Sequence, residues 1–367
     1  MRFHPGIIPY YEARYYLAQR FLKERTSQKI ANNRYKMEAV PNYDFTFFER
    51  IAELEKELDE RIEVTELMTR FFKPLKLREQ REGMPISIGD MLLTQPVMLY
   101  DGIDMDAVIE KYRANSQIEN LTNFYTYLYP FGFIDGAEYT LPEFMQAANE
   151  LLADPEEKWA LVDAAANPVD HLTALKPLVD AVAGYIGERT ELFEPIVGLV
   201  GDFVASEEEV DELFVSRMRF EKSTVERMIA FPCMFKFEGL NITGYEGDED
   251  FEVTLGCFYY AEARYAKLSR DPETHIALLK ILADSTRFKV LHELCDQSSY
   301  GLELAEKYGI TRNAMYYQLD QLLGYCLVKT EYEGRRMLHT MDKRTVYEKL
   351  TELRDYLVNG WKPEDEE

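Results

Sequence analysis

The side chains best placed for chemistry in this sequence are hydrogen-bonding groups near the C-terminal end of the chain. The stretch TRNAMYYQ at residues 311–318 holds a guanidinium, two carboxamides and two phenols. At the start of a helix, groups of these kinds can reach base edges and phosphates in the major groove of DNA. The residues expected to make such contacts are Thr311, Arg312, Asn313, Tyr316, Tyr317 and Gln318.

Two short helices joined by a tight turn would position these side chains. Gly309 can adopt the left-handed conformation that ends a helix, and Thr311 is a favoured N-cap for the next one. A small residue at Ala305, four positions before Gly309, lets the two helices cross closely. The second helix would bury apolar residues that recur at helical spacing, which are Ala314, Met315, Leu319 and Leu322. The pattern predicts a helix-turn-helix.

Residues 327–341 predict a two-stranded hairpin directly after this pair of helices. The expected strands cover 327–332 and 337–341, and the tip between them reads EGRR at 333–336. A glycine-containing turn that carries Arg335 and Arg336 is suited to a contact with a phosphate or with the minor groove.

Residues 343–358 predict a last helix whose apolar residues repeat at coiled-coil spacing. A terminal helix with such a stripe needs a partner, and the simplest partner is the same helix of a second copy in a two-fold dimer. An earlier helix, beginning at Pro272, would add a further apolar face. The residues predicted to form the dimer interface are Ile276, Leu279, Val346, Leu350, Leu353 and Leu357.

Three stretches of this region carry a family resemblance: ILADSTRFKVLHEL at 281–294, LELAEKYGITRNAMYYQLDQL at 302–322 and LVKTEYEGRRMLHTM at 327–341. Together with the last helix, they resemble the arsenic-repressor-type (ArsR-type) winged helix-turn-helix. The resemblance implies a homodimeric bacterial transcriptional regulator, expected to be a repressor, that pairs through its first and last helices. More loosely, the whole chain is similar to long members of this group that carry an extra helical N-terminal domain.

The sequence departs from the metal sensors of that family. The first helix of the motif begins with Tyr300, Gly301 and Leu302 where sensors place thiolates, and the last helix has carboxylates but no histidine. No metal or other cofactor is therefore expected. Asp320 stands where the family often has a basic residue, and the Tyr316–Tyr317 pair replaces smaller polar residues. An alternative hypothesis is that the unit is a protein-interaction module that no longer binds DNA.

The complete sequence predicts a mainly α-helical chain. Residues 1–225 indicate a helical N-terminal domain, with one long helix over 43–72, and residues 226–262 indicate a short antiparallel β segment attached to it. Residues 271–361 are the expected winged helix-turn-helix domain for DNA binding and dimerisation, and 362–367 an expected disordered tail. The N-terminal domain is expected to sense an effector, either a small molecule or a protein, whose identity the sequence leaves open.

Composition and motifs limit the function classes. The first 260 residues contain no GxGxxG, GxxxxGK[ST], GxSxG or HExxH motif, so the chain is not expected to be an enzyme. The net charge of the chain is −24, yet residues 307–349 hold 8 Lys and Arg against 5 Asp and Glu. The charge of one surface can differ from the net charge of the protein, so the acidic composition does not exclude DNA binding by this region. Because no stretch is long and apolar enough for a membrane span, and neither a signal peptide nor a disulfide pattern is present, a cytoplasmic location is expected.

Overall fold

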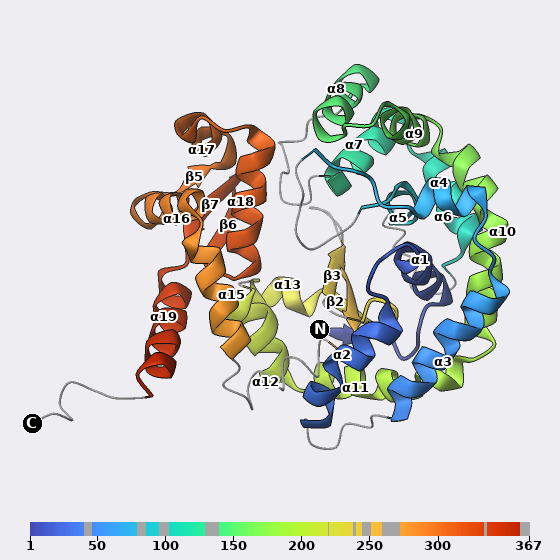
Figure 1. Ribbon diagram of the computed structural model, residues 1–367, viewed down its shortest axis with the longest axis horizontal. Coiled ribbons are helices and arrows are strands. Elements are labelled where there is room, and N and C mark those ends of the chain that lie inside the picture. Colours follow the sequence, from blue (N-terminus) through green and yellow to red (C-terminus); the bar gives the residue numbers. More distant parts are fainter. Residues whose placement is uncertain are drawn as a thin grey trace, which may run out of the picture. The chain divides into compact units, whose positions relative to one another are not determined.

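The computed structural model describes residues 1–39, 46–78, 86–94, 103–128, 139–218, 220–237, 240–243, 251–258, 272–333 and 336–359. The chain divides into two compact units, formed by the described residues of 1–258 and of 272–359. In Figure 1 the first unit runs from blue to yellow and the second from orange to red. Both units are mainly helical, and in the described residues each contains one small sheet. The tail expected at 362–367 lies outside the described residues.

Helices make up most of the first unit. Their bounds are α1 (Pro9–Gln19), α2 (Thr26–Ala39), α3 (Thr46–Arg61), α4 (Glu66–Phe72), α5 (Ile88–Leu93), α6 (Met105–Ala114), α7 (Gln117–Leu128), α8 (Leu141–Leu151), α9 (Pro155–Ala166), α10 (Pro168–Gly187), the 3-10 helix η1 (Thr190–Phe193), α11 (Glu194–Ala205), α12 (Glu207–Val210), the π-helix η2 (Asp211–Arg217) and α13 (Lys222–Glu226). Proline lies in the first turn of α1 and of α8 to α11, where a backbone N–H has no helical partner to lose. Helix α1 packs against α10 and α5 on the inner side of these helices (Figure 1).

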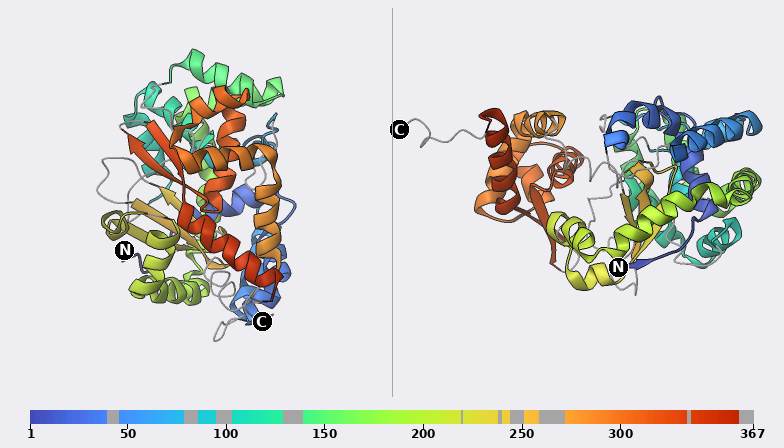
Figure 2. Two further views of the ribbon diagram at one scale, coloured as in Figure 1. Left: turned by 90° about the vertical axis from the view of Figure 1, so that its left-hand side faces the viewer. Right: turned by 90° about the horizontal axis from the view of Figure 1, so that it is seen from below.

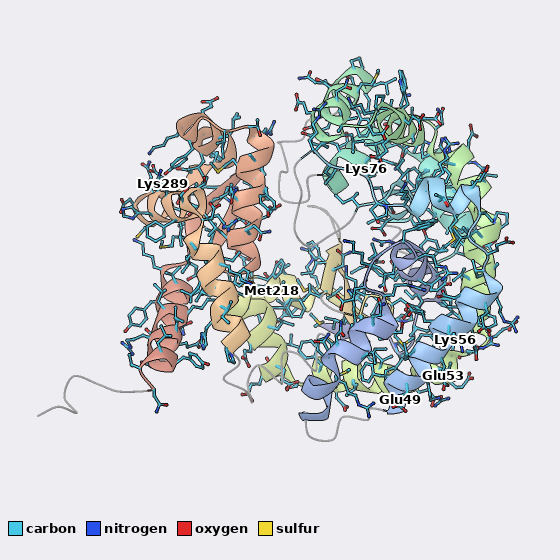
Figure 3. The ribbon with its side chains drawn as sticks, viewed as in Figure 1. Glu49, Glu53, Lys56, Lys76, Met218 and Lys289 are labelled. Atoms are coloured by element: carbon cyan, nitrogen blue, oxygen red, sulfur yellow. The ribbon has the colours of Figure 1, made fainter. Side chains whose placement is uncertain are left out.

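The long helix predicted over 43–72 is two helices, α3 and α4. Helix α3 buries Phe47, Ile51, Leu54 and Leu58 along one face. Its opposite face carries Glu49, Glu53 and Lys56, which point away from the unit (Figure 3). The helix ends at Arg61, and Thr65 begins α4 by accepting a hydrogen bond from the Met68 N–H at 3.1 Å. A side-chain cap of this kind starts a new helix instead of continuing the old one.

The sheet of the first unit is mixed, so the prediction of an antiparallel segment holds for β3 and β4 but is wrong for β2 and β4. Its strands are β1 (Arg2–Phe3), β2 (Met228–Cys233), β3 (Leu240–Thr243) and β4 (Phe251–Gly256), in the order β1-β2-β4-β3. Strands β1 and β4 both run parallel to β2, and β3 runs antiparallel to β4. Strand β3 lies at the edge of the sheet and pairs with the side of β4 that faces away from β2. The chain therefore reverses twice between β2 and β4, and these two strands run in the same direction. Their almost continuous burial is typical of parallel strands covered on both faces.

The second unit contains five helices and three strands in its described residues. Their bounds are α15 (Pro272–Ala283), α16 (Ser285–Asp296), β5 (Ser299–Tyr300), α17 (Gly301–Tyr308), α18 (Arg312–Gly324), β6 (Val328–Glu333), β7 (Arg336–Met341) and α19 (Lys343–Leu357). The sheet order is β5-β7-β6 and both pairings are antiparallel. Strands β6 and β7 form the predicted hairpin, whereas the short β5 was not predicted. Apolar residues of α16, α17 and α18 form most of the core, with contributions from α15, β6 and α19. The residues of the three main helices include Val290, Leu291, Leu294, Leu304, Met315, Leu319 and Leu322.

Candidate functional site

Helices α17 and α18 meet at a tight turn whose backbone is fixed by hydrogen bonds. Gly309 has φ 64° and ψ 30°, the left-handed conformation predicted for it. The Ile310 N–H donates to the Ala305 carbonyl at 3.1 Å and satisfies an acceptor at the end of α17. Thr311 Oγ1 then accepts a hydrogen bond from the Ala314 N–H at 3.1 Å, as expected of an N-cap. The chain therefore enters α18 in a defined direction.

Tyr316 points into the second unit, so the prediction that it faces outward is wrong. Its side chain is 9% exposed and belongs to the core. Gly301 provides the space, because a Cβ at that position would lie 2.6 Å from Tyr316 Cε1. Arg312 lies over the same ring, with its Cζ 5.6 Å from the ring centroid. Tyr316 is therefore a platform that orients Arg312 through a cation–π attraction.

The structure describes the remaining predicted contact residues to different extents. Tyr317 is half-buried on α18. Gln318 Oε1 accepts a hydrogen bond from Arg287 Nη1 at 3.1 Å, so the carbonyl end of this amide is held by α16. Three of the predicted groups lie outside what is described: the Asn313 side chain, all of Arg335 and the Arg336 side chain, although Arg336 begins β7. The described part of the surface at α18 thus centres on Arg312 and Tyr317.

Neighbouring carboxylates neutralise some of the basic side chains of the second unit. Lys307, near the end of α17, pairs with Glu293 of α16, and this hydrogen-bonded contact raises the pKa of Lys307 and lowers that of Glu293. Arg344 pairs with Glu348 on α19 at 2.8 Å. Lys289 is exposed on α16 (Figure 3). Arg312 on α18 and Arg287, which contacts Gln318, carry positive charge at this helix in the described part of the chain.

Helices α15 and α19 carry exposed apolar side chains. The two helices lie side by side (Figures 1 and 2), and the rings of His275 and Tyr356 meet with their centroids 4.5 Å apart. Four residues predicted for a dimer interface are on the surface: Ile276, Leu279, Leu350 and Leu357, of which Leu357 is 67% exposed. Tyr347 and Val358 are exposed on the same part of the chain. We call these six residues the association face.

Two residues predicted for the dimer interface face the interior of the second unit instead. Leu353 is 7% exposed and lies in the core, so its prediction as an interface residue is wrong, and Val346 is partly buried against the same core. The pairs Val346–Leu353 and Leu350–Leu357 each repeat at seven residues, but they are offset by four. All four residues therefore lie on the same side of α19, and their spacing does not distinguish the pair that the core covers from the pair that stays exposed.

The first unit contains a buried ionisable cluster where α1 meets the sheet, and the sequence did not predict it. The Glu12 carboxylate accepts hydrogen bonds from the N–H groups of Met234 (2.8 Å) and Phe235 (2.9 Å), which directly follow β2. Burial raises the pKa of Glu12 to about 7, although both backbone hydrogen bonds oppose the shift. Arg14 Nε lies 2.8 Å from Asp90 Oδ1, and both groups are largely buried.

A second carboxyl group of this cluster lies on β4. Glu252 accepts a hydrogen bond from the Tyr11 hydroxyl, and burial raises its pKa to about 7 against the opposing effects of Tyr11 and Arg14. Burial also lowers the pKa of Lys236 to about 8, and its Nζ lies 5.0 Å from the centroid of the Tyr15 ring. Glu12, Glu252 and Lys236 can therefore each gain or lose a proton at a pH near neutral. Their partners come from the chain itself, so the cluster joins α1 to the sheet.

The position of Glu12 bears on ligand binding. Ligands of open parallel sheets bind beyond the carboxyl ends of the strands, where backbone N–H groups are exposed. Here Glu12 already occupies the N–H groups after β2. These donors are therefore not available to a ligand.

The charged residues of α1 would usually suggest a helix with an exposed face. The signal that could have revealed the burial is the Tyr-rich helix α1, with Tyr10, Tyr11, Tyr15 and Tyr16 on all its sides.

In the part of the chain that the structure describes, no three His, Cys, Asp or Glu side chains come together as metal ligands would. No helix there has the length and apolarity to cross a bilayer. No protein-family model, curated protein or solved structure matches this chain.

Proposed function

We propose that the chain is a DNA-binding transcriptional regulator whose second unit is a winged helix-turn-helix. In this proposal α18 is the recognition helix, the β6–β7 hairpin is the wing, and repression is the expected outcome at the promoter. The first unit would respond to an effector or to a protein partner. Two copies would place their recognition helices in successive major grooves, about 34–36 Å apart.

The order and pairing of the elements in the second unit support the proposal. Helices α17 and α18 enclose a turn fixed by Gly309 and Thr311, and the antiparallel hairpin follows directly. The observation that carries most weight is Arg312, which lies in the first turn of α18 above the Tyr316 ring. An arginine held in this way has lost much of its side-chain freedom before it meets a base or phosphate.

The association face supports pairing of two copies. Burial of exposed Leu279 and Leu357 against a second copy would remove apolar surface from water, at roughly 25 cal/mol per Å². A two-fold axis brings identical surfaces together, so α15 and α19 could supply both halves of the interface. The resemblance seen in the sequence implies the same pair of helices.

An electrophoretic mobility-shift titration with fragments of the chain's own promoter tests the proposal. We expect specific binding that weakens steeply as salt rises, because bound phosphates release counterions. Arg312→Ala should weaken binding roughly tenfold, the size of a lost base or phosphate contact. Arg50→Ala is the matched control, because Arg50 is an exposed arginine on α3 of the first unit and its loss changes the net charge equally. Equal affinity of Arg312→Ala and Arg50→Ala would contradict the proposed role of α18.

A second candidate function is docking of another protein by the same unit. Phe288 on α16 and Leu302 on α17 are exposed apolar residues, and neither is suited to contact with phosphates. The local positive charge is small, since Lys307 is paired with Glu293. The absence of any shift with promoter DNA at low salt would favour this function. A Leu302→Ser variant would then be compared with the native chain for capture of a partner.

A further inference from the structure

Arg287 connects three helices of the second unit through one side chain. Its Nε donates to the carbonyl of Ile281 at 2.9 Å and its Nη2 to that of Lys280 at 3.3 Å, both at the end of α15. Its Nη1 donates to Gln318 Oε1 on α18 at 3.1 Å. The Arg287 backbone N–H donates to Asp284 Oδ1, the N-cap of α16, at 2.9 Å. A single guanidinium thus contacts the end of α15 and the middle of α18.

The chemistry of these contacts makes the connection directional. The last carbonyls of α15 have no helical donors, so the guanidinium supplies what the helix end lacks. Arginine donates but cannot accept, which means that the Gln318 atom facing it must be the carbonyl oxygen. The planar fork of the guanidinium also fixes its three bonded groups relative to one another. A shift of the end of α15 would therefore act directly on Gln318.

The two connected helices have different roles in the proposed function. Helix α15 contributes Ile276 and Leu279 to the association face, whereas α18 carries Arg312 and Tyr317. Gln318 follows Tyr317 in the chain and lies within two turns of Arg312. Whatever orders the end of α15 should therefore also order the part of α18 that would meet DNA.

We propose that Arg287 is a positioning residue that couples the association face to α18, so that pairing of two copies and DNA binding strengthen each other. This inference rests on the proposed function, because α18 is assigned to DNA there. Thermodynamic reciprocity requires that DNA tighten pairing by the same factor by which pairing tightens DNA binding. One hydrogen bond of ordinary net strength should contribute about threefold to tenfold of this factor.

Sedimentation of the full chain, with and without a promoter duplex, tests the coupling. The key variant is Gln318→Met, which keeps the length of the side chain but removes the acceptor. Gln321→Met, a similar change on the same helix, is the matched control. We expect Gln318→Met to pair normally without DNA but to lose about threefold to tenfold of the tightening caused by DNA. Arg287→Lys, which keeps the charge but not the fork, should lose a similar part. If Gln318→Met lowers thermal stability but keeps the native tightening, the contact is only structural and the coupling is rejected.

Amide hydrogen exchange supplies a measurement that does not need DNA. When the native chain pairs at rising concentration, exchange should slow in α15 and α19 and also in α18. In Gln318→Met, exchange should slow in α15 and α19 only. If the native chain binds no duplex, the proposed function fails and this measurement alone decides the coupling. Three results would each overturn the coupling. These are exchange in α18 that does not respond to pairing, exchange in α18 that responds equally in Gln318→Met, and a chain that never pairs.

Discussion

Helices α1 and α19 arrange their polar and apolar residues in opposite ways. Helix α1 buries Glu12 and Arg14, and groups of the first unit satisfy both of them. Helix α19 exposes Leu350 and Leu357 to solvent. A buried charge with partners inside the chain points to a structural contact, whereas an exposed apolar stripe calls for a partner from outside. The comparison supports the proposal that association and recognition belong to the second unit.

The largest effect is expected from the buried arginine. Arg14→Met should lower the free energy of unfolding of the first unit by about 3–5 kcal/mol, because it breaks the buried ion pair between Arg14 and Asp90. Arg354→Met, at an exposed arginine of α19, should change stability by less than about 0.5 kcal/mol. Urea denaturation followed by circular dichroism measures both. Equal effects of the two substitutions would remove the distinction between the two helices.

Two leucines of α19 sharpen the comparison within one helix. Leu353→Ala should destabilise the second unit by about 2–4 kcal/mol, since Leu353 is buried in the core. Leu350→Ala should leave stability almost unchanged but weaken pairing, because Leu350 is 43% exposed. Thermal unfolding and sedimentation equilibrium separate the two effects. A fully dimeric Leu350→Ala variant with native affinity would show that the association face lies elsewhere.

The buried cluster should make the stability of the first unit depend on pH. Glu12 and Glu252 have a pKa of about 7 when folded and an ordinary value of 4.5, so the folded state holds protons that the unfolded chain releases. This contribution is complete below pH 4.5 and is lost as the pH rises through 7. From about pH 6 to 8, each carboxyl group should therefore lower the free energy of unfolding by about 1 kcal/mol.

Other charged groups that face the cluster modify this dependence. Lys236 has a folded pKa of about 8 and acts in the opposite sense. Its contribution raises the free energy of unfolding as the pH increases, mainly above pH 8. Arg14 favours the charged form of Glu252. Urea midpoints at several pH values measure the slope. The Glu252→Gln variant keeps an acceptor for Tyr11 and should lose about half of the slope, so an undiminished slope would exclude Glu252 as a source.

Two glycines of the second unit should give effects of about 2 kcal/mol or less. Gly301→Ala should destabilise the unit by about 1–2 kcal/mol, because the new methyl would press on the Tyr316 ring. The shifted ring should also misplace Arg312 and weaken DNA binding. Gly324→Ala is the control, since a Cβ there meets open space at the end of α18, and a gain of about 0.5 kcal/mol is expected. Thermal unfolding and mobility shifts measure both variants.

Local chemistry explains what the sequence predicted well. Gly309 and Thr311 act on their own neighbours, so the turn and the start of α18 could be located from residue types. The burial of Tyr316 depends on space left by Gly301, fifteen residues away, and a helical pattern holds no information about that space. Leu353 was misassigned for a related reason: sequence spacing shows a stripe but not which neighbour covers it.

The first unit was harder to predict because its contacts join distant parts of the chain. Period-two segments indicated strands β2, β3 and β4, but strand direction depends on pairing order, which alternation does not encode. The two-residue strand β1 has no sequence pattern of its own and exists through its pairing with Ile229 and Ala230. Glu12 and Glu252 looked like ordinary surface carboxylates, since their burial depends on groups far along the sequence.

The separation between Glu12 and its amide partners affects how the chain can be made. The acceptor and donors lie 222 and 223 residues apart, so a ribosome adding 5–20 residues per second needs roughly ten to forty seconds between them. During that interval the tyrosines of α1 have no sheet to cover them, and a nascent chain in this state is a natural client for chaperones. The second unit, whose Arg287–Gln318 bond closes over 31 residues, faces a far shorter wait.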